Sequence, residues 1–138
     1  MKKKYIIIIA VAAFVGFYLF NALKNTKPLE IENAPDWRTL GEAQLEARET
    51  DKLILVDVYE VGCKYCRAME QSVYPDSTVR AVLDASYIPA KVNGNSEELI
   101  TFNGEQVVAR EWAQSNGIYV FPGTLILDAE GNLLKQRI

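Results

Sequence analysis

The sequence contains two cysteines, Cys63 and Cys66, which are separated by two residues. A cysteine thiolate attacks disulfides and binds soft metals, so a close pair of cysteines can carry out dithiol chemistry. A small exported domain held together by disulfide bonds would carry four or more cysteines. With only these two, the domain depends on an apolar core for its stability, and the pair is free to react.

Both cysteines fall at the predicted start of a helix. A thiol at a helix N-terminus faces unpaired N–H groups and the positive end of the helix dipole, which lowers its pKa from about 8.5 toward 7. We therefore predict that Cys63 is the nucleophile and that the charge of Lys64 assists it. Cys66 lies one turn further on, where it can attack the mixed disulfide at Cys63 and release the reduced client.

Two other roles for the pair are a structural disulfide bond and a metal site. A zinc site needs about four ligands, and the sequence has no histidine to complete one with two thiolates in a single chain. The same absence excludes Cys-His and Ser-His catalytic pairs and imidazole metal sites. We expect no metal and no cofactor, and the redox-active group is then the Cys63–Cys66 pair itself.

A short, almost continuous apolar run, Leu53–Val58, precedes the cysteines and predicts a strand that is buried on both faces. The helix that follows should run from Cys63 to about Tyr74, where Pro75 stops it. Asp57 interrupts the strand, and burying an unpaired carboxylate costs several kcal/mol. The strand therefore either turns Asp57 toward water at the rim of the sheet or buries it for a function.

The rest of the pattern alternates helices and strands, which is typical of an α/β sheet with helices on its faces. Thr39 and Glu42 have the spacing of a capping box that starts an amphipathic helix. Pro89 lies inside a predicted strand and cannot donate to a ladder, which favours an edge position. The other expected elements are helices at 39–49, 78–85 and 105–116, the last closed by Gly117, a strand at 87–92, and a hairpin of strands 124–128 and 133–138.

The composition allows one small domain. The chain has 138 residues, and about a hundred remain to build a core once the apolar N-terminus is set aside. Fifteen basic and 18 acidic side chains give a net charge of −3, which favours neither nucleic acid nor a polyacidic partner.

An uncharged run from Tyr5 to Leu23 follows the lysines at positions 2–4. As a helix it would span roughly 28 Å, close to the hydrocarbon thickness of a bilayer. A cleavable signal peptide is the alternative, but its apolar region is usually shorter and ends in a small-x-small site, which this run lacks. The run therefore predicts an uncleaved, single-pass signal anchor.

The chain is expected to divide into a transmembrane helix at 1–24, a linker at 25–35 and a folded domain at 36–138. Basic residues are retained on the cytoplasmic side of a membrane. The lysines before the apolar run therefore place the N-terminus in the cytoplasm and the domain outside it, in the periplasm or an equivalent extracytoplasmic space.

The order of elements around the cysteines resembles the thioredoxin superfamily, in which a strand leads into a CxxC motif that opens a helix. Family members carry a buried acid six residues before the first cysteine, and Asp57 has that spacing in VDVYEVGCKYC. They also carry an Ala-Lys-x-Asn element, as in Ala90–Asn93, and a proline after a Gly-Ile/Val segment, as at Pro122. The likeness covers roughly Trp37–Ile138, and CRAMEQSVYPDSTVRAVL resembles the C-terminal domain of DsbD-type thiol:disulfide interchange proteins.

The resemblance implies a thioredoxin-like fold, with a central mixed sheet flanked by helices. It implies that Asp57 accepts the proton of Cys66 and that Lys91 modulates this acid. It also implies that Pro122 is a cis-proline beside which an extended substrate segment pairs. The substrate-binding residues implied in this way are Lys64, Tyr65, Phe121 and Pro122.

Three departures from the family pattern stand out. Gly62 replaces the usual tryptophan before the first cysteine, and Gly123 stands where threonine usually follows the proline, so both should alter the substrate-binding rim. The family also continues into a final helix, which is apparently absent after Ile138. That face of the sheet is then covered differently, or the sequence is incomplete.

We predict a membrane-anchored thiol:disulfide oxidoreductase that reduces disulfides of extracytoplasmic proteins. Its partners would be oxidised client proteins and a membrane dithiol that donates electrons. The alternatives are a disulfide oxidase or isomerase of the same fold, and a non-catalytic module that holds a client or Cu(I) through the two thiolates. The Lys64-Tyr65 dipeptide between the cysteines does not decide among them.

Overall fold

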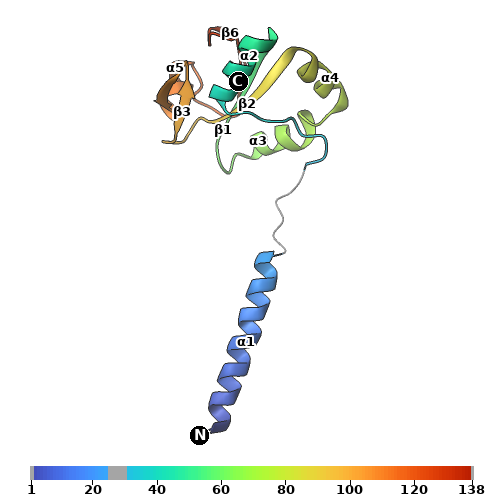
Figure 1. Ribbon diagram of the computed structural model, residues 1–138, viewed down its shortest axis with the longest axis vertical. Coiled ribbons are helices and arrows are strands. Elements are labelled where there is room, and N and C mark those ends of the chain that lie inside the picture. The colour runs from blue at the N-terminus through green and yellow to red at the C-terminus, as the bar shows by residue number, and fades with distance from the viewer. Residues whose placement is uncertain (1, 25–30, 138) are drawn as a thin grey trace. The chain divides into compact units, whose positions relative to one another are not determined.

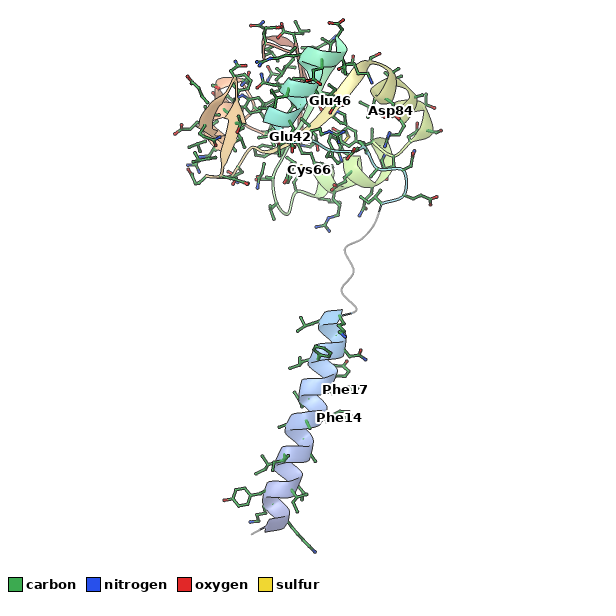
Figure 2. All side chains as sticks on the ribbon, viewed as in Figure 1. Phe14, Phe17, Glu42, Glu46, Cys66 and Asp84 are labelled. Carbon is green, nitrogen blue, oxygen red and sulfur yellow. A yellow bond between two sulfur atoms is a disulfide. The ribbon has the colours of Figure 1, made fainter. Side chains whose placement is uncertain are left out.

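The computed structural model describes residues 2–24 and 31–137, which fall in two compact units, Met1–Glu30 and Ile31–Ile138 (Figure 1). The first unit contains the helix α1, Lys2–Lys24. Within Lys3–Lys24, an 18-residue window has a mean hydropathy of 2.5, and none of that window is buried. Figure 2 shows apolar side chains such as Phe14 and Phe17 projecting outward from this helix. By length and composition α1 can cross a membrane, although a signal sequence near an N-terminus has the same properties.

The second unit is built on a four-stranded mixed sheet with the strand order β2-β1-β5-β6. The central strand β1 pairs in parallel with β2 and antiparallel with β5, and β5 forms an antiparallel hairpin with β6. This confirms the predicted hairpin, of which Ile138 lies outside the described residues. The strands are β1 (Leu53–Tyr59), β2 (Tyr87–Asn93), β5 (Gly123–Leu127) and β6 (Leu133–Arg137).

One face of the sheet forms the core with the helices α2 (Leu40–Thr50) and α5 (Ala109–Ser115). Successive side chains of a strand point to opposite faces, and Ile54, Val56 and Val58 of β1 are fully buried on this one. The capping box of α2 is present as predicted, because the side chains of Thr39 and Glu42 each bond to the other's backbone N–H. The predicted amphipathic character of α2 is confirmed by its buried residues, which are Leu40, Ala43, Gln44 and Ala47.

The other face of the sheet carries the helices that follow the cysteines, and Figure 1 shows α2 and α3 on opposite sides of the sheet. They are α3 (Lys64–Ala68), the π-helix η1 (Met69–Val73) and α4 (Ser77–Ser86). We predicted one regular helix to about Tyr74, but its second half is wound as a π-helix in which Tyr74 N donates to Met69 O at 3.0 Å. Asp76 caps α4 by accepting from Thr78 N and Val79 N.

The predicted helix at 105–116 is wrong in its first half. Leu99–Phe102 and Glu105–Val108 form an antiparallel hairpin, β3 and β4, and only Ala109–Ser115 is helical. The turn between the strands has positive φ at Asn103 and Gly104, which suits an Asn-Gly pair in a two-residue hairpin. Gly117, with φ of 78°, closes α5 in a left-handed cap as predicted.

The edge strand β2 contains Pro89, as expected. A short extended segment lies outside it, where Arg38 N donates to Pro89 O and Lys91 N donates to Arg38 O. The carbonyl of Pro89 thus points away from β1, and its nitrogen points the same way. The missing N–H of proline therefore leaves the β1–β2 ladder intact.

A shallow apolar groove lies open beside α4. The groove is lined by Leu55, Val79, Val82, Leu83 and Ile126.

Candidate active site

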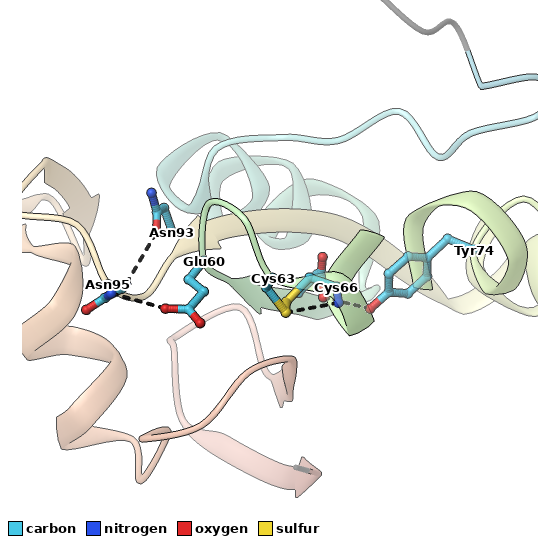
Figure 3. The surroundings of a disulfide bond; sticks show 7 residues. Glu60, Cys63, Cys66, Tyr74, Asn93 and Asn95 are labelled. Carbon is cyan, nitrogen blue, oxygen red and sulfur yellow. Dashed lines mark hydrogen bonds between the residues drawn. A yellow bond between two sulfur atoms is a disulfide. The ribbon is translucent and has the colours of Figure 1, made fainter. Parts of the chain in front are cut away.

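Cys63 and Cys66 are joined by a disulfide bond at the start of α3, and their Cα atoms are 5.3 Å apart (Figure 3). The chain reaches Cys63 from β1 through a tight turn, in which Cys63 N donates to Glu60 O at 3.3 Å. The loop after β2 holds this turn from the side, because Asn95 donates to the carboxylate of Glu60 at 3.1 Å. The turn after β1 and the loop after β2 thus fix the position of the disulfide.

Cys63 is the N-cap residue of α3, and its Sγ accepts the N–H of Cys66 at 3.1 Å. A sulfur at this position meets a backbone donor and the positive end of the helix dipole, both of which stabilise a thiolate once the disulfide is reduced. Cys63 is half-buried, whereas Cys66 is only 7% exposed. Cys63 is therefore the more accessible of the two cysteines.

Asp57 lies on the face of β1 that carries α3, η1 and α4. It is 1% exposed, so the strand buries it and does not turn it to water. Its Oδ1 accepts a hydrogen bond from the hydroxyl of Tyr74 at 2.9 Å. Burial raises the pKa of Asp57, while the bond from Tyr74 and the positive charge of Lys91 act in the opposite direction. Burial and the neighbouring Asp57 carboxylate also raise the pKa of Tyr74, which keeps the phenol protonated as a donor.

Lys91 stands directly opposite Asp57 in the β1–β2 register. Its ammonium group bonds to Glu70 of η1, with 2.5 Å between Nζ and Oε1. The rings of Trp37 and Tyr59 lie 5.0 and 5.2 Å from the same nitrogen. Lys91 thus influences the pKa of Asp57 by its charge alone, and the charge of Glu70 opposes that influence.

The peptide bond between Phe121 and Pro122 is cis, and Pro122 immediately precedes β5, whose Gly123 is paired with Val58 of β1. Lys64 and Tyr65 are exposed on the first turn of α3. The side chain of Phe121 packs against the hydrophobic core instead, and a Cβ on Gly94 would lie 2.7 Å from its ring. Of the four predicted substrate-binding side chains, Phe121 is therefore directed partly inward.

The two glycines that depart from the family pattern differ in their surroundings. Gly62 has φ of 87° with open space around it, so the chain conformation itself favours glycine there. Gly123 is buried, and a Cβ would lie 2.7 Å from Ile118 Cδ1. Ile118 packs against Gly123, and the effect of this glycine on the substrate-binding rim stays a prediction.

A family model described as a thioredoxin-like domain matches residues 40–138 of this chain. The chain belongs to the thioredoxin-like domain family. The matched segment includes both cysteines, Asp57 and Pro122. Membership with a CxxC-spaced pair supports thiol-disulfide redox activity in general terms. No curated protein sequence matches the chain.

Solved structures show the same thioredoxin-like fold. The DsbH oxidoreductase is 18% identical with a TM-score of 0.59, and the match covers 82% of this chain and 78% of that one. A thioredoxin from Thermus thermophilus is 21% identical with a TM-score of 0.59, covering 76% and 75%. The oxidised C-terminal domain of DsbD from Neisseria meningitidis is 17% identical with a TM-score of 0.53, covering 71% and 78%.

Sequence reasoning missed two residues of the thioredoxin-like site, Glu70 and Tyr74. Glu70 lies four residues after Cys66, a spacing that places it on the same helical face as the buried cysteine. That signal was present in the sequence. Tyr74 was interpreted only as the end of the helix before Pro75, and its contact with Asp57 depends on the π-helical winding.

Proposed function

We propose that this protein is a membrane-anchored thiol:disulfide oxidoreductase that reduces disulfides of extracytoplasmic proteins. The observation that carries the proposal is the Cys63–Cys66 disulfide, whose more exposed cysteine is the N-cap of α3, directly after the strand β1 that buries the carboxylate of Asp57. The thioredoxin-like fold and the apolar helix α1 support it.

In the reductive direction, the Cys63 thiolate attacks one sulfur of a client disulfide. The client S–S bond breaks, a mixed disulfide forms on Cys63, and the first client thiolate leaves. The Cys66 thiol then gives its proton to Asp57, and the new thiolate attacks Cys63 Sγ. The Cys63–Cys66 disulfide forms, the second client thiolate leaves, and two electrons have passed to the client. A membrane dithiol returns the pair to its reduced form.

The surroundings of the pair fit the docking of an extended client segment. Lys64 and Tyr65 offer a charge and an aromatic surface beside Cys63. The cis bond before Pro122 belongs to the segment that enters β5, whose backbone is the proposed pairing partner of the client, and Phe121 supports that segment from within.

Trapping of clients by the full chain in intact cells tests the proposal. In Cys66→Ala the mixed disulfide on Cys63 cannot be resolved, so client adducts should accumulate and disappear on reduction. The matched control is Cys63→Ala/Cys66→Ala, which should form none. If Cys66→Ala captures no protein and the purified chain does not reduce insulin disulfides, the enzyme is not a reductase. Tight Cu(I) binding without either activity would support the non-catalytic alternative.

Redox state and topology are read from the same cells with a membrane-impermeant maleimide. A pair that is mostly reduced at steady state marks a reductase, and a mostly oxidised pair marks a donor of disulfides. Labelling of the reduced cysteines from outside is expected if the domain is extracytoplasmic. Labelling only after the cells are opened would contradict the proposed orientation.

A further inference from the structure

The buried bond between Tyr74 and Asp57 is not needed to explain the fold, because an apolar pair would fill the same space without an ionisable group. Both residues are almost fully buried, with exposures of 3% and 1%, and the bond between Oη and Oδ1 is 2.9 Å. Figure 3 shows the phenol oxygen of Tyr74 pointing toward the end of the helix that carries Cys66. Tyr74 therefore approaches the proposed base from the side of the disulfide.

The π-helix η1 brings Tyr74 to this position. Eight residues of a regular α-helix turn through about 800°, so Tyr74 would lie about 80° away from the direction of Cys66. The extra residue in the turn closed by Tyr74 N and Met69 O offsets roughly 100° of this rotation. Cys66 and Tyr74 then face the same side, toward β1. Such π-helical turns are frequent at functional sites.

We propose that Tyr74 is a positioning residue for the resolving step of disulfide exchange. Its hydroxyl holds one oxygen of the Asp57 carboxylate and leaves the other oxygen to take the proton of Cys66. The inference rests on the proposed function, since it concerns the same reaction. In this step the proton moves from Cys66 to the free oxygen of Asp57, and the phenol proton stays on Tyr74.

The charges around Asp57 explain why such a donor matters. The titratable or polar groups that the structure places near it are Tyr74 after η1, Glu70 on η1, Lys91 on β2 and Thr124 on β5, and Cys66 on α3 is the proposed proton donor. Lys91 bonds to Glu70, so its charge is largely balanced. The hydroxyl of Tyr74 is thus the direct side-chain donor that stabilises the ionised carboxylate in a buried place.

The test uses Tyr74→Phe, which keeps the ring that packs edge-to-face on Trp37 at 4.9 Å and removes the hydroxyl. The full chain, reduced and held in detergent micelles, is mixed with a self-quenched peptide disulfide, and release of the second thiol is followed from pH 5 to 9. Because a hydrogen bond to a charged group is lost, the rate near pH 6 should fall about tenfold and the acid limb should move to higher pH. Tyr87→Phe is the matched control and should stay within about twofold of the parent.

A double-mutant cycle with Asp57→Asn separates positioning from a structural effect. If Tyr74 acts through Asp57, adding Tyr74→Phe to Asp57→Asn should change the rate less than about twofold. An equal loss in both backgrounds, or an unshifted acid limb in the single variant, would overturn the inference. The parent would still reduce the probe in either case, so the proposed function is judged separately by that activity.

Incorporation of 3,5-difluorotyrosine at position 74 covers the case in which Tyr74→Phe does not fold. Fluorination makes the phenol a stronger donor while the hydroxyl and the ring are kept. The carboxylate of Asp57 is then stabilised further, and the acid limb should move to lower pH, opposite to the phenylalanine variant. An acid limb that does not move would refute the role of the hydroxyl.

Discussion

Replacing Asp57 by asparagine should change how the stability of the oxidised protein depends on pH. Burial raises the pKa of Asp57 above its ordinary value of 3.8 in the folded state. The folded state then binds the proton more tightly than the unfolded chain, so the parent loses stability as pH rises from about 3.8 through the raised folded pKa. The asparagine side chain of the variant carries no charge and lacks this loss. Cys63 and Cys66 do not titrate while they are disulfide-bonded.

The size of this stability loss follows from the surroundings of the Asp57 carboxylate. An ion at 1% exposure carries a desolvation penalty of several kcal/mol. The hydrogen bond from Tyr74 offsets about 1.5–3 kcal/mol of it. A net cost of about 2 kcal/mol then remains at pH 8 and is absent at pH 3. For a domain near 100 residues, this corresponds to a change of about 10 °C in Tm.

Thermal unfolding of the full, oxidised chain in detergent micelles measures this effect. Trp37 and Trp112, the two tryptophans of the chain, both lie in the Ile31–Ile138 unit, so their fluorescence reports that unit alone. The Tm of Asp57→Asn minus that of the parent should increase by about 10 °C between pH 3 and pH 8. The asparagine amide itself changes the Tm by an amount that does not depend on pH. The test is therefore how the Tm difference between variant and parent changes with pH.

Asp128→Asn is the control with the opposite sign. Hydrogen bonds from the side chain and backbone of Asn132 lower the pKa of Asp128, so its contribution to stability is present above the ordinary carboxyl pKa and is lost as pH falls. The difference between Asp128→Asn and the parent should therefore become more negative as pH rises. A constant Tm difference for Asp57→Asn, or one with the slope of the control, would refute the reasoning.

Three further substitutions test the packing and charges of the site. Gly94→Ala should lower stability by about 1–3 kcal/mol in chemical denaturation, because its Cβ would lie 2.6 Å from Val58 Cγ1 and 2.7 Å from the Phe121 ring, and an unchanged midpoint would contradict this packing. Glu70→Gln should lower the pKa of Asp57, since it removes a negative charge and frees Lys91. An NMR titration of the Asp57 carboxyl carbon measures this pKa, and a value that rises or stays the same would contradict the prediction. Gly62→Ala should cost about 1 kcal/mol of stability through its φ of 87° without any steric contact, and a stabilised variant would exclude the left-handed conformation.

The predictions that succeeded rest on local signals with one physical solution. The Thr39–Glu42 box has a side chain for each orphan N–H at the helix start. The run Leu53–Val58 is too short and too branched for a helix, and the sheet buries it as β1. Pro89 was placed at an edge because proline lacks the N–H that an inner strand needs. The thioredoxin-like family was identified from the spacing of residues around the cysteines, and the match of residues 40–138 confirms it.

The predictions that failed depend on competition between alternatives of similar energy. Val108 and Trp112 have helical spacing, but the Asn103-Gly104 pair favours a tight hairpin turn, and β4 extends to Val108 before α5 begins. The π-helical winding of η1 has no strong sequence signature. The place of Tyr74 against Asp57 therefore could not be predicted. The resemblance implied that Lys91 modulates Asp57, but the sequence did not show that Lys91 stands opposite Asp57 or that Glu70 binds its ammonium group.

The two edges of the sheet have unequal capacity to recruit another chain. On the outer side of β2, Pro89 offers no N–H, and the segment at Arg38 already bonds to Pro89 O and Lys91 N. A foreign strand cannot add there without displacing that segment. The strand β6 has one strand neighbour, β5, in the described sheet. Backbone-mediated self-association is therefore directed to β6, where Lys135 supplies a charge of the kind that discourages edge-to-edge aggregation.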